Sequence, residues 1–233
     1  MRKSWSVLYL SAFVLCISSS RLQAQTDAAA SVYGAFNSST SGNSTMQSPS
    51  NTAGALLELR HIWNSLAGVE ATYSYNRANQ TYSTVEYPPC PVGVLPCGPY
   101  TITSSIPNNA HEITGDWVVS MKFANVRPFV LAGGGVLLNL PATGTATEYV
   151  TNCSSGLPLP PCSVSNGSIS TSTQTKAVYV YGAGLDWTVL LHLGLRFQYR
   201  GNLYKAPDLT DVFSSTNSFT HNSEPMIGAF FRF

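Results

Sequence analysis

The segment 224–233 alternates between apolar and mixed positions up to a terminal phenylalanine. Positions counted back by twos from the end are apolar: Phe233, Phe231, Ala229, Ile227 and Pro225. The positions between them include Arg232 and Glu224. Because successive side chains of a strand point to opposite faces, this segment predicts a strand with one apolar face. A soluble domain gains little from ending on such a strand, whereas a membrane barrel must present one face of every strand to lipid.

The start of the chain carries the features of a secretory signal peptide. Basic residues at positions 2 and 3 precede an apolar run from Val7 to Ile17, and Ala24 supplies a small residue at a cleavage point. The run is shorter than the roughly 20 residues that a membrane-spanning helix needs. We therefore expect residues 1–24 to be removed as a signal peptide and residues 25–233 to form the mature domain. Lipid attachment at Cys16 is the alternative, but a leucine precedes it where such a site needs a small residue.

The composition fits a surface that faces lipid and excludes some partners. Charged residues make up 10% of the chain and aromatic residues 11%, whereas an ordinary soluble domain has about 25% charged residues. Loss of the basic residues at positions 2, 3 and 21 with the signal peptide lowers the basic count from 12 to 9 against 11 acidic residues, a net charge of −2. That balance excludes the basic surface of a nucleic-acid-binding protein. The sequence contains no phosphate-binding loop or dinucleotide fingerprint, so we expect no cofactor.

Eight runs with strand character divide the mature chain. They are Ala28–Asn37, Thr52–Ile62, Leu66–Asn76, Ala110–Phe123, Val126–Leu140, Lys176–Thr188, His192–Tyr204 and Glu224–Phe233. Short connections at 63–65, 124–125 and 189–191 alternate with long polar ones at 38–51, 77–109, 141–175 and 205–223. In an up-and-down barrel this alternation puts all short turns on one side and all long loops on the other. The predicted fold is all-β, an eight-stranded antiparallel up-and-down transmembrane β-barrel.

Charged side chains fall on one face of the predicted strands, as Glu58 and Arg60 do opposite Leu57 and Leu59. The charged face carries six acids and six bases: Glu58, Glu70, Glu112, Asp116, Asp186 and Glu224, with Arg60, Lys122, Lys176, Arg196, Arg200 and Arg232. An eight-stranded barrel is just wide enough for side chains to fill. Balanced charges therefore predict an ion-pair network that plugs the lumen, with the selectivity path of a narrow pore as the alternative. The strand Val126–Leu140 is apolar on both faces, and its orientation stays open.

A soluble barrel of the lipocalin type would show the same alternation with its apolar face turned inward. Aromatic residues near the predicted strand ends, including Trp63, Trp117, Phe123 and Trp187, favour the membrane barrel. Such residues lie at the two interfaces between lipid and water. Confinement of the long loops to one side favours the same interpretation.

The terminal strand resembles the C-terminal strand of small bacterial outer-membrane β-barrels, and the mature chain resembles the OmpA/OmpX type of this family by its pattern. The resemblance implies short periplasmic turns, long extracellular loops, contact with outer-membrane lipid and a location in the bacterial outer membrane. It also implies that Phe231 and Phe233 form an assembly signal read by the barrel assembly machinery. We expect the protein to be a monomer.

Four cysteines remain after the signal peptide, and all lie in the two longest loops. Four cysteines allow three pairings. We expect Cys90–Cys97 and Cys153–Cys162, because shorter loops close at a smaller entropic cost. Zinc binding is the alternative, but neither pair has the spacing of a zinc motif and neither loop places a histidine beside its cysteines.

A catalytic role has one candidate element, His221-Asn222-Ser223-Glu224. It resembles the His-x-Ser element of lipid A deacylase barrels, but the acid that those enzymes place further along has no counterpart here. We therefore expect no enzymatic activity. The expected function is a structural, adhesion or surface-binding role, carried by disulfide-stapled extracellular loops that bind an unknown extracellular ligand. A narrow pore and a lipid-modifying enzyme are the alternatives.

Overall fold

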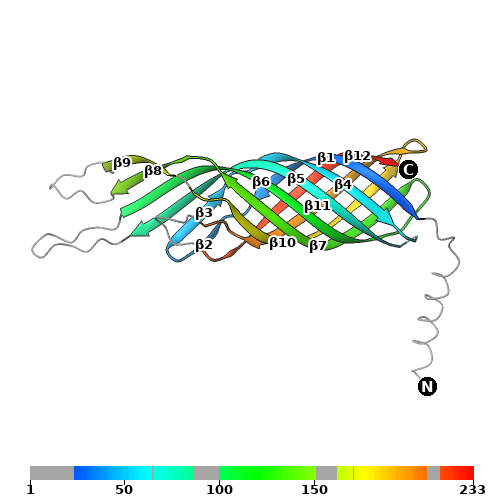
Figure 1. The fold of residues 1–233 in the computed structure, drawn as a ribbon, viewed down its shortest axis with the longest axis horizontal. Helices are drawn as coiled ribbons and strands as arrows, with labels where there is room; N and C mark the ends of the chain where they lie inside the picture. The colour runs from blue at the N-terminus through cyan, green and yellow to red at the C-terminus, as the bar shows by residue number, and fades with distance from the viewer. Residues whose placement is uncertain (1–23, 65, 87–99, 151–161, 170, 209–215) are drawn as a thin grey trace, which may run out of the picture.

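The computed structural model of the chain describes residues 24–64, 66–86, 100–150, 162–169, 171–208 and 216–233. Eight long strands form a closed antiparallel barrel (Figure 1). They are β1 (Gln25–Asn37), β4 (Thr52–Ile62), β5 (Ala67–Glu86), β6 (Tyr100–Ser120), β7 (Val126–Pro141), β10 (Gln174–Thr188), β11 (Leu193–Lys205) and β12 (Phe219–Arg232). Each strand pairs with the next in this order, and β12 pairs with β1 to close the ring. The predicted eight-stranded up-and-down barrel is confirmed.

Four short strands add to the barrel on the side of the long connections. They are β2 (Thr40–Gly42), β3 (Thr45–Pro49), β8 (Gly144–Val150) and β9 (Cys162–Ile169). Strand β3 pairs with residues 80–84 of β5, and β8 pairs with residues 100–105 of β6. We call β2, β3, β8 and β9, together with residues 77–86 and 100–109, the outer sheet. Figure 1 shows β8 and β9 at the end of the barrel remote from the C-terminus.

The sequence predicted loops where residues 77–86 and 100–109 form strands, and this expectation was wrong. The pairing of β5 with β6 runs from Ala67 and Val119 to Glu86 and Tyr100 without a change of register. These outer halves are rich in Ser, Thr and Asn. Beyond the apolar band the outward face no longer has to be apolar, and the inward face keeps only a few apolar side chains, Tyr82, Ile102 and Ile106, so the alternation in the sequence is weaker there.

Side chains alternate between a buried lumen and an exposed outer surface. In β4, Glu58 and Arg60 are 4% and 0% exposed, whereas Leu57 and Leu59 are 58% and 52% exposed. The outer surface of the barrel is therefore apolar, and the lumen holds the charge. No helix in the described residues has the length and apolar character to cross a membrane.

The structure settles the orientation of β7, which the sequence left open. Arg127, Phe129, Leu131 and Leu137 are buried on the lumen side. Val130 between them is 54% exposed and faces outward. One wall of the lumen is thus largely apolar, and the charged side chains of the opposite strands pack against it.

Aromatic side chains form two belts around the outer surface of the barrel. Near the short turns, the rings of Trp63 and Trp117 lie 5.8 Å apart, and those of Phe231 and Phe233 lie 6.2 Å apart. Toward the outer sheet, tyrosines pair with histidines. The Tyr73 hydroxyl lies 2.8 Å from Nδ1 of His111, and the Tyr181 hydroxyl lies 2.8 Å from Nε2 of His221. Side chains with an apolar body and a polar tip are typical of the boundaries of the lipid layer.

Candidate functional site

Two hairpins each carry a buried ion pair on the lumen face. Arg60 and Glu70 are cross-strand partners in β4 and β5, and Nε of Arg60 donates to Oε2 of Glu70 at 2.6 Å. Asp186 and Arg196 are partners in β10 and β11, and Nε of Arg196 donates to Oδ1 of Asp186 at 2.7 Å. All four side chains are fully buried.

These pairs also contact each other across the lumen. Nη1 of Arg60 lies 3.1 Å from Oδ2 of Asp186. Arg196 reaches back to Glu58 at 2.8 Å and to Asp27 at 2.9 Å. Charged groups are stable in such a dry interior only when they are paired and hydrogen-bonded, and this arrangement pairs each one. The network therefore joins the walls of the lumen through fully buried side chains.

Aromatic rings complete the filling. The guanidinium carbon of Arg60 lies 3.9 Å from the ring centroid of Phe129 in β7. The guanidinium carbon of Arg196 lies 5.6 Å from the same centroid and 5.5 Å from that of Phe230 in β12. A cation over an aromatic face gains an electrostatic attraction that strengthens when water is excluded. Strand β7 thus supplies an aromatic ring against which the two guanidinium groups pack, although it carries few charged side chains itself.

A second layer of polar contacts surrounds Arg200, which lies closer to the outer sheet than Arg196 does. Its guanidinium donates to the hydroxyls of Thr72 and Thr114, each at 3.1 Å. It also lies 3.4 Å from Oε1 of Glu112 and 3.6 Å from Oδ2 of Asp116. The two threonines are themselves 2.7 Å apart. Arg200 therefore ties β11 to β5 and β6 through the lumen.

The structure places the twelve predicted lumen charges at different depths. Nine face the lumen and are at most 4% exposed: Glu58, Glu70, Glu112, Asp116, Asp186, Glu224, Arg60, Arg196 and Arg200. Lys122 lies beyond the end of β6 and is exposed, so its assignment to the lumen was wrong. Lys176 lies at the mouth and pairs with Asp208 at 2.7 Å. Arg232 lies near the short turns and donates to the Thr188 hydroxyl at 3.3 Å.

Two lumen charges were missed by the sequence analysis. Asp27 is fully buried and contacts Arg196. It was missed because the predicted first strand began at Ala28, the residue after Asp27, whereas β1 begins at Gln25. Arg127 is 7% exposed and donates to Gln25 at 3.0 Å. Its strand gave no alternation from which an inward face could be read.

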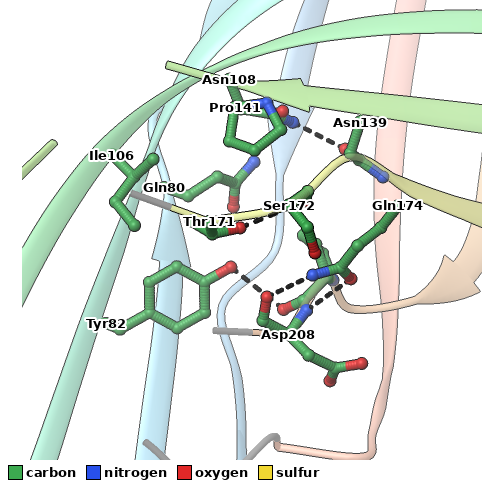
Figure 2. A pocket seen from close by; sticks show the side chains of 11 residues that line it. Gln80, Tyr82, Ile106, Asn108, Asn139, Pro141, Thr171, Ser172, Gln174 and Asp208 are labelled. Carbon is green, nitrogen blue, oxygen red and sulfur yellow. Dashed lines mark hydrogen bonds between the residues drawn. The ribbon is translucent and has the colours of Figure 1, made fainter. Parts of the chain in front are cut away.

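Residues 206–208, which follow β11, lie at the mouth of the lumen (Figure 2). Tyr82 donates to the carbonyl oxygen of Pro207 at 3.0 Å, and burial raises the pKa of the Tyr82 phenol, which keeps it a donor. The main-chain N–H of Asp208 donates to Oε1 of Gln174 at 2.9 Å, and the Gln174 amide donates back to the Asp208 carbonyl. Together with the Lys176 ion pair, these bonds hold the segment inside the outer sheet, beside a small pocket that we call the mouth pocket.

A small polar chamber lies between the mouth and the Arg200 layer. Glu112 and Glu224 line it. Gln80, Asn108 and Asn139 line both this chamber and the mouth pocket, so the two spaces adjoin. Both spaces lie on the outer-sheet side of the Arg60–Arg196 network.

The candidate catalytic element is split between the two faces of β12. His221 lies on the outer face, with its Nδ1 3.5 Å from Oγ of Ser223 and its Nε2 bonded to the Tyr181 hydroxyl. Glu224 faces the lumen and is 1% exposed, so it cannot orient His221. Among the described residues no carboxylate contacts this histidine. The arrangement lacks the acid that would hold His221 as a general base.

The remaining predicted residues lie at the ends of strands or outside the described residues. Cys90, Cys97 and Cys153 are outside them, as is the signal peptide up to residue 23, and Cys162 is the first residue of β9. The disulfides stay a prediction. Phe231 and Phe233 are 48% and 66% exposed on the outer surface beside the short turns. Within the described ranges, no three His, Cys, Asp or Glu side chains are grouped as metal ligands.

Comparison with known proteins gives one family match. Residues 9–223 match the model of the outer membrane protein beta-barrel domain. Among solved structures, the chain is similar to Neisserial surface protein A, with 14% identity over 91% of this chain and 99% of that one and a TM-score of 0.46. It is similar to Ail, the attachment invasion locus protein of Yersinia pestis, with 17% identity over 90% and 99% and a TM-score of 0.40. It is also similar to OprG of Pseudomonas aeruginosa, with 12% identity over 90% of this chain and 96% of that one and a TM-score of 0.44. No curated protein matches.

Proposed function

The chain belongs to the outer membrane protein β-barrel family, and from that membership we propose that it is a surface-binding protein with a closed lumen. The protein resides in the bacterial outer membrane as an eight-stranded barrel. The proposed binding surface is the outer sheet. The barrel serves as its anchor.

The observation that carries the proposal is the length of β5 and β6. They are 20 and 21 residues long, whereas a strand needs about 9–11 residues to cross the lipid. Roughly half of each strand therefore continues outside the membrane as ordered sheet. A protein that used its barrel only to fill the membrane would have no need of this extension.

The outer sheet suits a neutral, hydrogen-bonding ligand. Residues 77–86 and 100–109 contain many hydroxyl and amide side chains and two charges, Arg77 and Glu86. Pairing with β3 and β8 holds these strands in place. A preorganised surface loses less conformational entropy on binding than a mobile loop. An extracellular ligand such as a glycan, rich in hydroxyl groups, matches this chemistry.

Shortening the β5–β6 hairpin tests the proposal. Asn76 and Ala110 are cross-strand partners, so an Asn-Gly turn can join them and remove residues 77–109 while the membrane half keeps its register. Cells that display the wild-type protein should bind to an array of immobilised glycans and matrix proteins, and cells with the shortened protein should not. A heat-modifiability gel checks that the shortened barrel is folded. Equal binding by both, or none by the wild type, would refute the proposal.

The closed lumen is tested separately by conductance. The fully buried network of Arg60, Arg196 and their acids supports a lumen that is blocked at this level. Purified protein in planar bilayers should therefore show no steady ion current. A current that is lost on narrowing the lumen, for example with Gln198→Trp, would favour the narrow pore.

A further inference from the structure

The upper lumen holds more acid than base. Glu112, Asp116 and Glu224 face it, and in the described part of the chain Arg200 is the one basic side chain within 4 Å of this set. Glu224 has no ion pair among the described residues. In the layer below, by contrast, every carboxylate contacts Arg60 or Arg196. The carboxyl groups of Glu112 and Glu224, two of this surplus, border the polar chamber.

Two asparagines connect the carboxylates of the chamber. Asn202 in β11 and Asn222 in β12 are cross-strand partners. The amide nitrogen of Asn202 donates to Oε2 of Glu112 at 3.1 Å, and that of Asn222 donates to Oε1 of Glu224 at 2.6 Å. Side chains of direct cross-strand partners start about 5 Å apart. These bonds hold the carboxyl groups of Glu112 and Glu224 on neighbouring asparagines, and both glutamates line the same chamber.

Several oxygens at the chamber have no partner although they are buried. They are Oδ1 of Asn222, Oδ1 of Asn108 and Oε2 of Glu224. Their residues line the chamber and are 4%, 4% and 1% exposed. A buried acceptor without a partner is costly, so such atoms mark the place of a further group. That group must be a donor or a cation.

We propose that the chamber binds one hard divalent cation, for which Ca²⁺ is the best match. Glu112, Glu224 and the amide oxygens of Asn108 and Asn222 supply the carboxylate and carbonyl oxygens that Ca²⁺ prefers. Among the described residues that line the chamber none is a histidine or a cysteine, which disfavours softer metals. With two carboxylates and space for retained water, the site resembles the weak class, with a Kd of about 10⁻⁴–10⁻³ M.

The cation has a route from outside. The mouth pocket adjoins the chamber at Asn108 and Asn139, which Figure 2 shows side by side, with the Asn108 amide donating to Asn139 at 2.6 Å. The site lies inside the barrel, apart from the outer sheet. Cation binding is therefore a property separate from the proposed surface binding, and either can fail without the other.

Calorimetric titration of the refolded, detergent-solubilised barrel with CaCl2 tests the proposal. The wild type should bind one Ca²⁺ per chain, and Glu224→Gln should weaken binding at least tenfold. Asp208→Asn is the matched control, because that carboxylate is already neutralised by Lys176, and it should bind as the wild type does. Asn222→Asp, which adds a carboxylate to the same site, should strengthen binding. A heat-modifiability gel confirms that each variant is folded.

Several results would overturn the proposal. Absence of Ca²⁺ binding by the wild type would mean that Glu112 and Glu224 hold a proton instead. Equal affinity of the wild type and Glu224→Gln would place the cation elsewhere. If Glu224→Gln does not fold, the expected gain of affinity in Asn222→Asp decides the question, and its absence refutes the site.

Discussion

Arg196 donates to Asp186 at 2.7 Å across the β10–β11 hairpin, and the two residues are direct cross-strand partners ten positions apart in the sequence. Arg60 and Glu70 have the same relationship across β4–β5. Each hairpin can therefore form its own pair before the barrel closes. Closure then adds the contacts across the lumen, such as Arg60 with Asp186 at 3.1 Å. The network links local strand pairing to the completed ring.

Removal of Arg196 should destabilise the barrel strongly. Arg196→Ala leaves Asp186, Glu58 and Asp27 buried with fewer cations, which costs on the order of 3–5 kcal/mol in the free energy of unfolding. Urea titration of the refolded barrel in lipid vesicles measures this loss. Lys205→Ala is the control, because Lys205 is an exposed cation of the same strand, and it should cost less than about 1 kcal/mol. A loss below about 1 kcal/mol for Arg196→Ala would mean that the lumen is hydrated.

The cost of an arginine on the outer surface should depend on how deep in the lipid it lies. Phe197 is 41% exposed and pairs with Leu185, between the Trp187 and Tyr181 levels of β10. Phe197→Arg should cost about 2–4 kcal/mol, as expected for a cation near the middle of the lipid. Phe219→Arg makes the same exchange at an exposed site near the outer sheet and should cost about 0–1 kcal/mol. Equal folding yields in lipid vesicles would contradict the assigned membrane band.

The sequence predicted the membrane half of the fold well, because lipid on one side imposes a strict alternation. The range Thr52–Ile62 agrees with β4 at both ends. The prediction was wrong for residues 77–86 and 100–109, where the outward face is polar and the inward face mixes polar side chains with a few apolar ones such as Tyr82, Ile102 and Ile106, so the alternation is weak. The long polar connections therefore hid an ordered sheet. No local pattern distinguishes such strands from a loop, because their pairing is decided by the register begun in the membrane.

The lumen could be predicted only in part for a related reason. Parity assigns a face to a charge but does not give its height along the barrel or its partner. Arg60 and Arg196 were assigned to the lumen face. Parity could not show that Asp186 contacts both of them, because Arg60 and Asp186 lie on strands far apart in the sequence. Lys176 lies at the height of the mouth and pairs with Asp208 from a loop. Lys122 was misplaced because its strand ends at Ser120.

Close backbone approach at β7 should make one glycine indispensable. A Cβ at Gly135 would collide with the carbonyl oxygen of Ile113 in β6, whereas a Cβ at Gly115 meets nothing within 4 Å. Overpacking of this kind costs about 1–3 kcal/mol. Gly135→Ala should therefore lower the free energy of unfolding by that amount, and Gly115→Ala should leave it nearly unchanged. Identical urea midpoints for the two variants would argue against the close approach.

The terminal aromatic should matter for assembly in cells more than for stability. Its main-chain N–H donates to the carbonyl oxygen of Thr26 at 3.1 Å, a bond that Phe233→Ala retains. The exposed ring contributes at most about 1.5–3 kcal/mol of apolar burial. Phe233→Ala should lower the yield of folded barrel in the outer membrane while refolding in detergent stays nearly intact. Phe233→Tyr, which keeps an aromatic ring, should assemble normally. Unchanged surface display of Phe233→Ala would refute a role in recognition by the assembly machinery.

The cysteine pairs should form within hairpins rather than between them. Glu86 and Tyr100 are the last partners of β5 and β6, and Val150 and Cys162 are the last partners of β8 and β9. Cys90 and Cys97 thus belong to the connection of one hairpin. Cys153 belongs to the connection of the other, and Cys162 is the strand residue that ends it. The shorter closures cost less entropy.

Non-reducing digestion should therefore give two separate cross-linked peptides. Reduction should leave the barrel folded on a heat-modifiability gel, since the membrane half does not depend on the hairpin tips. Pairing between the hairpins has a physical basis, because Tyr100 and Val150 are also cross-strand partners, which brings the two hairpin ends side by side. One cross-linked species that contains both connections would establish that pairing and contradict ours. We still expect the local pairs. Each closes a short stretch of chain between two strands that already pair with each other, so its closure costs less entropy.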